Sequence, residues 1–125
     1  MAKKSVPATD DEMEKALIHS RQCSLVLMRQ GSCFMPGPGG PAGTSLDPHA
    51  RFMLGLENHG TVLFSGPVTD STEIKWMAVF ASGDRLTVRD YMTDDPDVIS
   101  GRLKYEIHPW TMLGGDPPPE KIDGT

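Results

Sequence analysis

The chain has 125 residues and a formal net charge of −5 at pH 7, which suits one domain with short extensions and argues against a nucleic-acid binder, since such proteins carry a basic face. No basic run exceeds the Lys3-Lys4 pair, and no apolar stretch is long enough for a membrane span or a signal peptide, so no membrane association is expected. The two cysteines, Cys23 and Cys33, lack a CxxC spacing and are expected to be free thiols in a reducing cytoplasm.

Residues 1–22 are expected to be an extension in front of the main domain. Thr9 followed by Glu12 forms the pattern of a capping box, in which each side chain bonds the backbone N–H of the other residue. The pattern predicts a short helix with a narrow apolar stripe that includes Leu17.

The apolar run Cys23–Arg29 predicts the first strand of the main domain. The segment 31–45 is dense in glycine and proline, which predicts a long loop that covers or borders a pocket. Three prolines within it remove backbone N–H donors, and this argues against a phosphate-binding loop.

The segment Ser45–Val68 predicts a helix, a glycine stop, a strand and a Gly-Pro turn. Asp47 is expected to be the N-cap, because its carboxylate can accept free N–H groups of the first turn. Pro48 suits the first helical position, and Gly60 suits the left-handed residue that ends the helix.

One face of this helix carries a histidine together with residues that must be buried: His49, Phe52, Met53 and Leu56. The positive end of a helix dipole disfavours an imidazolium, so a neutral His49 is expected near pH 7. Such a ring can act as a general base if a carboxylate fixes one of its nitrogens, and Asp95 is the leading candidate for that partner, with Asp70 second. The alternatives are a packed histidine that bonds a backbone carbonyl, and an Asp95 that only caps a helix.

Two strands follow the helix. Thr61–Ser65 alternates, with Val62 and Phe64 predicted on one face. Ile74–Phe80 is apolar on both of its faces, which predicts that both faces of this strand are covered.

A second helix is expected after Ser82-Gly83-Asp84, and Asp95-Pro96 should interrupt it because proline cannot donate into a continuing helix. A short turn leads to the alternating strand Arg102–His108, which Pro109-Trp110 is expected to close. Residues 111–125 have the composition of a disordered tail.

The predicted order is therefore strand, helix, strand, strand, helix, strand over residues 23–110, with an extra helix in front. A βαββαβ chain most naturally forms an α+β fold of the ferredoxin-like type, with a four-stranded antiparallel sheet and both helices on one face. The other sheet face would lack cover, so we expect a homodimer in which two sheets pack face to face.

Three motifs resemble those of the YCII-related family of small proteins with a dimeric α+β barrel: PHARFMLGLENHGTVLFSGPV, the DDP at 94–96 and the closing YEIHPW. The similarity spans roughly residues 24–110. The family is associated with a His-Asp active site, and a few members act in aromatic degradation, including a dehydrochlorinase. The loop at 31–45 and the N-terminal helix depart from the family pattern.

The resemblance implies catalytic roles for His49 and Asp95, and it implies that a turn of three residues lines the pocket: Ser65, Gly66 and Pro67. Asp70, just after this turn, is a further candidate binding residue. The FSGP sequence lacks the glycine-framed elbow of a serine hydrolase, so Ser65 is not expected to be a nucleophile. The four histidines include no HxxxH pair, so neither a metal site nor a cofactor is predicted.

Three functional hypotheses follow. The first is a cofactor-free lyase or isomerase that acts on a small, aromatic or otherwise organic compound through a His-Asp acid/base pair. The second is a dimer that binds a small ligand or has a regulatory role without turnover. The third is a protein-interaction module.

Overall fold

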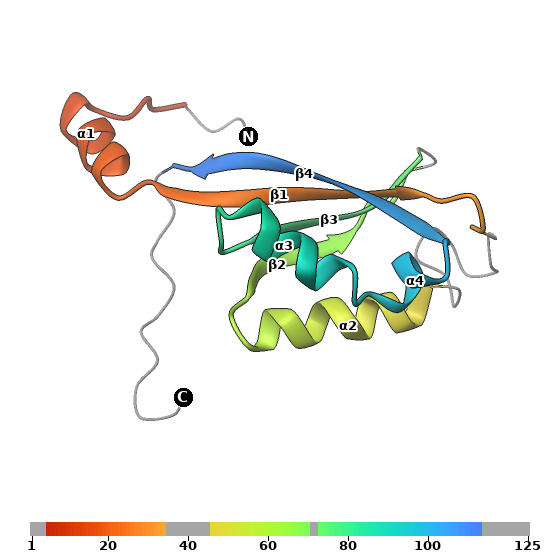
Figure 1. Cartoon of the computed structure of the whole chain (residues 1–125). Helices are drawn as coiled ribbons and strands as arrows, with labels where there is room; N and C mark the ends of the chain where they lie inside the picture. Colours follow the sequence, from red (N-terminus) through yellow and green to blue (C-terminus); the bar gives the residue numbers. More distant parts are fainter. Residues whose placement is uncertain (1–4, 35–45, 71–72, 114–125) are drawn as a thin grey trace. The chain divides into compact units, whose positions relative to one another are not determined.

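The computed structural model describes residues 5–34, 46–70 and 73–113. Most of the loop predicted at 31–45 and most of the tail predicted at 111–125 lie outside these described residues. Figure 1 shows the elements in chain order: α1 (Asp10–Ile18), β1 (Arg21–Gln30), α2 (Asp47–Asn58), β2 (Val62–Pro67), β3 (Ile74–Phe80), α3 (Arg85–Met92), α4 (Pro96–Ile99) and β4 (Leu103–Met112).

The chain divides into two units, one of residues 22–110 and one of the flanking segments 1–21 and 111–125. The flanking unit contains α1, which begins with the predicted capping box. The Thr9 N–H donates to Glu12 Oε1 at 2.9 Å, and the Glu12 N–H donates to Thr9 Oγ1 at 3.1 Å. No residue of α1 is buried.

The larger unit is built on one sheet with the strand order β2-β3-β1-β4. Strand β3 runs antiparallel to both β1 and β2. Helices α2, α3 and α4 lie on one side of the sheet (Figure 1). The predicted α+β class and four-stranded antiparallel sheet are confirmed, and the strand order is compatible with a ferredoxin-like arrangement.

The core lies between this inner sheet face and the helices. The fully buried members include Val26 and Met28 of β1, Ala78 and Phe80 of β3, and Leu103 of β4, with Met53, Val88 and Met92 from the helices. The predicted buried face of α2 is confirmed, because His49 and Met53 are inaccessible and Phe52 and Leu56 pack against the core. The 3.6-residue period of the apolar positions is what turns this face towards the sheet.

The start of α2 differs from the prediction. Leu46 occupies the N-cap position without a side-chain cap, and the predicted N-cap Asp47 is already helical. Leu46 is fully buried in the core, which fixes the helix start there, and the exposed Asp47 carboxylate accepts from Arg51 Nε at 3.0 Å instead. Pro48 is consequently the second helical residue rather than the first, and Gly60 has the expected left-handed φ of 79°.

The predicted alternation in β2 is wrong. Val62 pairs with Phe80 of β3 and is buried, but the register shifts before Phe64, which pairs with Val79. The shift inserts one extra residue, Leu63, so Val62 and Phe64 face opposite sides of the sheet. Phe64 is consequently 52% exposed.

The end of the domain contains two more corrections. The predicted turn after Asp95 is a short helix, α4, with Asp95 as its N-cap and Pro96 in its first turn. Strand β4 continues through Pro109 to Met112 rather than closing at Pro109. A proline is tolerated there because β4 is an edge strand, where one side of the backbone has no neighbouring strand to receive a hydrogen bond.

Candidate functional site

Two residues that are far apart in the sequence, and that were predicted to pair, are in contact in the structure. His49 Nδ1 forms a hydrogen bond with Asp95 Oδ2, and both side chains have an exposed fraction of 0%. His49 is brought there by the first turn of α2, and Asp95 is brought there by the loop that leads into α4. Asp70, the second candidate partner, is an exposed residue after β2 and is not the carboxylate that contacts His49.

The Asp95 carboxylate has two functions at once. Its Oδ1 accepts the Asp97 N–H at 3.0 Å and so caps α4, while its Oδ2 accepts from the histidine ring. The capping alternative and the pairing hypothesis are therefore both correct about where this side chain points. Because the cap holds one oxygen in place, the other oxygen is presented to His49 in a fixed orientation.

Asp97 is a member of this cluster that the sequence pattern did not indicate. Its exposed fraction is 1%, and its Oδ2 accepts the backbone N–H of His49 at 3.1 Å. Its Oδ1 accepts from Arg102 Nη1 at 3.2 Å. Asp97 thus supplies from α4 the cap that α2 lacks locally, and it ties the two helix starts together.

Trp76 of β3 is the second residue of the site that the sequence pattern does not indicate. Its ring meets the His49 ring edge to face, with centroids 4.7 Å apart and an interplanar angle of 90°. Within the described part of the chain, two nitrogens of these rings are buried without a hydrogen-bond partner: His49 Nε2 and Trp76 Nε1. No sequence signal separates this tryptophan from an ordinary core residue, since its strand is apolar apart from Lys75.

The hydrogen bonding decides the chemistry that His49 offers. An ionised carboxylate only accepts hydrogen bonds, so with Asp95 ionised the proton between the two side chains is on Nδ1. In the neutral ring the lone pair is then on Nε2, which is the nitrogen that can accept a proton. If it does so, the Asp95 carboxylate faces the resulting imidazolium and stabilises it.

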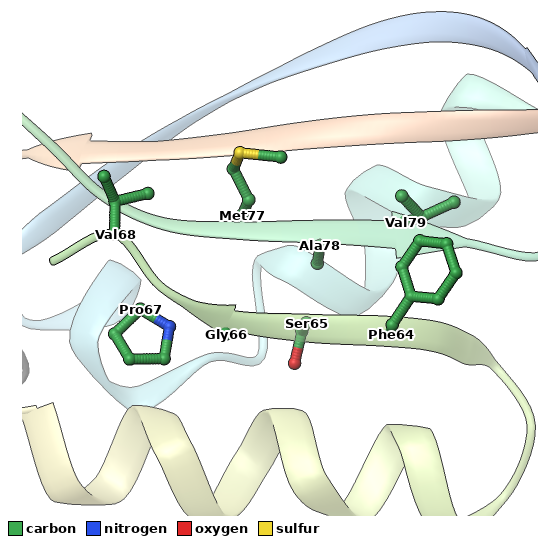
Figure 2. A pocket seen from close by; sticks show the side chains of 8 residues that line it. All are labelled: Phe64, Ser65, Gly66, Pro67, Val68, Met77, Ala78 and Val79. Carbon is green, nitrogen blue, oxygen red and sulfur yellow. The ribbon is translucent and has the colours of Figure 1, made fainter. Parts of the chain in front are cut away.

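The predicted Gly-Pro turn is wrong, because Ser65, Gly66 and Pro67 belong to strand β2 and pair with β3. These three residues also lie away from the His49–Asp95 pair. Ser65, Gly66 and Pro67 line an open hollow of about 330 Å³, together with Phe64, Val68 and three residues of β3: Met77, Ala78 and Val79. Figure 2 shows Phe64, Met77 and Val79 pointing away from α2, whereas Ser65 and Pro67 point towards it. The exposed side chains of Phe64 and Met77 put the open side of the hollow on the outer face of the sheet. Neither His49 nor Asp95 lines it. The structure therefore does not bring the predicted binding turn and the His-Asp pair together in one hollow.

The described ranges contain no group of three or more histidine, cysteine, aspartate or glutamate side chains placed to hold a metal ion. None of the helices described is both long enough and apolar enough to cross a membrane. Cys23 is buried and Cys33 is exposed, and both are free thiols. Searches of the chain against protein-family models, curated proteins and solved structures found no match.

Proposed function

We propose that this chain is a YCII-like α+β protein of the ferredoxin-like type that acts as a cofactor-free lyase or isomerase on a small organic compound. His49 and Asp95 form its acid/base pair. The observation that carries the proposal is the contact between these two fully buried side chains, which come from different helix starts. Taking two ionisable groups out of water is unfavourable, and such pairs concentrate at functional sites.

The proposed reaction begins with proton abstraction. His49 Nε2 takes a proton from the substrate, and the electron pair of the broken bond stays on the substrate. The proton returns to a different atom of the same molecule in an isomerase, or the substrate expels a leaving group in a lyase. Asp95 supports the step by holding the ring through Nδ1 and by facing the imidazolium.

A second candidate function is a non-catalytic dimer that binds a small ligand. The outer hollow favours it, because the hollow is lined by apolar side chains, of which Phe64 and Met77 are 52% and 42% exposed. Exposed apolar patches are typical of contact sites for a ligand or a partner. In this hypothesis the His49–Asp95 pair only joins α2 to α4.

The two candidates are separated by an assay for proton abstraction that needs no known product. Small organic acids, phenols and ketones are incubated with the protein in D2O, and loss of C–H signals is followed by NMR. The proposal expects exchange of at least one compound, with a rate that falls about 10²–10⁴-fold in His49→Gln, the usual contribution of a general base. Asp95→Asn should also slow exchange, because the ring loses the group that stabilises its charged form.

His59→Gln is the matched control, since His59 is an exposed histidine at the other end of the same helix. This variant should exchange substrates at the wild-type rate. A folded His49→Gln protein that retains the wild-type rate would rule out the catalytic role. Ligand binding without exchange in the wild-type protein would establish the second candidate instead.

A further inference from the structure

The rings of His49 and Trp76 each have a nitrogen that the described part of the chain leaves without a hydrogen bond. Over the ranges that the structure describes, His49 Nε2 and Trp76 Nε1 have no hydrogen-bond partner. The two residues are 0% and 6% exposed. Buried polar groups in folded proteins are almost always bonded, so two such atoms on contacting rings indicate a place where another molecule bonds.

The two nitrogens need different hydrogen-bond partners. Trp76 Nε1 carries a hydrogen and can only donate. In the neutral ring with its proton on Nδ1, beside Asp95, His49 Nε2 carries the lone pair and can only accept. One small group offers both an acceptor to the first nitrogen and a donor to the second, and that group is a hydroxyl.

Other ligand groups match this pair less well. A carboxylate presents only lone pairs, which would face the lone pair of Nε2. An ammonium presents only hydrogens, which would face the indole N–H. An apolar group would leave both nitrogens unbonded, at the desolvation cost that buried polar groups avoid.

We propose that Trp76 Nε1 and His49 Nε2 together bind the hydroxyl group of a small ligand. The inference rests on the proposed function, for which it names hydroxyl compounds as the substrate class and Trp76 as a residue that touches the substrate. The two rings are in direct contact, with their centroids 4.7 Å apart. The hydroxyl oxygen accepts from the indole, and its hydrogen is donated to Nε2.

This arrangement also defines the first chemical step. The O–H bond breaks, the proton moves to Nε2, and the electron pair stays on the oxygen. The oxyanion then accepts the hydrogen bond of Trp76, and the imidazolium is paired with Asp95. A fixed donor aimed at the atom that gains charge stabilises that charge without any reorganisation of solvent.

Phenol and toluene provide a matched pair of probes, because they differ mainly in the replacement of a hydroxyl by a methyl group. We expect phenol to cause saturable shifts of the Trp76 indole N–H signal and of the His49 Nε2 signal in ¹⁵N-labelled protein. Toluene should shift neither. Trp76→Phe keeps an aromatic ring but loses the N–H, and it should weaken phenol binding about tenfold, as expected for one hydrogen bond.

Trp110→Phe is the matched control, since Trp110 is the other tryptophan and is 37% exposed. This variant should bind phenol as the wild type does. Equal binding of phenol and toluene, wild-type affinity in Trp76→Phe, or the absence of a phenol response at Trp76 would each overturn the inference. The same NMR samples also show whether magnetisation passes from bulk water to the Trp76 indole N–H. If it does, and phenol causes no response, the bonded group is a structural water and the inference fails.

The same samples separate this inference from the proposed function. If phenol binds through Trp76 while His49→Gln exchanges substrates in D2O at the wild-type rate, the hydroxyl site exists and the catalytic proposal is wrong. If His49→Gln abolishes exchange while phenol does not shift the Trp76 indole N–H signal, the catalytic proposal is supported and the hydroxyl site is wrong.

Discussion

Asp95 is the residue on which both helix starts at the site depend. One of its oxygens caps α4, and the other bonds a histidine in the first turn of α2. A buried acceptor that serves two donors cannot be replaced by solvent, because its exposed fraction is 0%. Removing it therefore leaves two donors unbonded at once.

Asp95→Ala is expected to lower the free energy of unfolding by about 2–4 kcal/mol, the sum of a lost cap and an unbonded buried donor. Asp95→Asn keeps an oxygen for the α4 cap and should have a smaller effect, about 1 kcal/mol. Urea unfolding followed by circular dichroism measures both. The neighbouring Asp94 is exposed, so Asp94→Ala should stay within about 0.5 kcal/mol of wild type. An Asp95→Ala protein as stable as Asp94→Ala would show that the two hydrogen bonds contribute nothing.

The site is thus more than the two residues that the motif indicates. Asp97 bonds the backbone of His49, and Trp76 meets its ring edge to face. Neither contact has a signature in the sequence, because each depends on how α4 and β3 pack against α2. His49 and Asp95 were found because a histidine on an apolar helix face and an aspartate before proline are locally unusual.

At the scale of elements, α2 shows most clearly how local chemistry sets a boundary. Its C-terminal end is followed by Gly60 at φ 79°, a conformation that only glycine adopts without strain. Gly55 is inside the helix and gains nothing from such freedom. Neither glycine has an atom within 4 Å of a Cβ added to it, so a methyl group would find open space at both.

The two glycines therefore make opposite predictions. Gly60→Ala is expected to destabilise the protein by about 1 kcal/mol through backbone strain alone. Gly55→Ala should stabilise it by about 0.5–1 kcal/mol, because alanine loses less backbone entropy in a helix. Chemical denaturation of the two variants beside wild type provides the test. Changes of the same sign in the free energy of unfolding of the two variants would contradict this explanation of the helix end.

The elements that the sequence predicted correctly are those with a long, regular pattern. The apolar face of α2 repeats over three turns, and the capping box of α1 is a local pattern of two residues. The predicted faces of β2 failed because one extra residue reverses an alternation of period two, and nothing in VLFSGP shows where it is inserted. The predicted N-cap of α2 failed because Asp97, distant in the sequence, bonds its first turn instead.

At the scale of the whole domain, the outer face of the sheet carries two kinds of surface. Over β2 and β3 it is apolar and hollowed, with Phe64 and Met77 exposed. At β1 and β4 it carries an ion pair, in which Arg29 Nη2 lies 3.0 Å from Glu106 Oε1. The hydrogen bond from Arg29 holds the pKa of Glu106 below its ordinary value, so this carboxylate is ionised at neutral pH. An apolar zone with a charged border is the usual anatomy of a protein interface, and we propose that a second copy of the chain covers β2 and β3.

Met77→Lys tests the homodimer. Wild-type protein is expected to sediment as a dimer at micromolar concentrations, and the variant is expected to sediment as a monomer, because an ammonium group is strongly disfavoured in an apolar contact. Leu54→Lys is the matched control, since Leu54 is 55% exposed but belongs to α2, on the other side of the sheet. It should leave the dimer unchanged.

Thermal unfolding provides a second test of the dimer. A dimer that dissociates on unfolding has a melting temperature that rises with protein concentration. Wild-type protein that sediments as a monomer throughout, or a Met77→Lys protein that remains as dimeric as Leu54→Lys, would contradict a homodimer through this face.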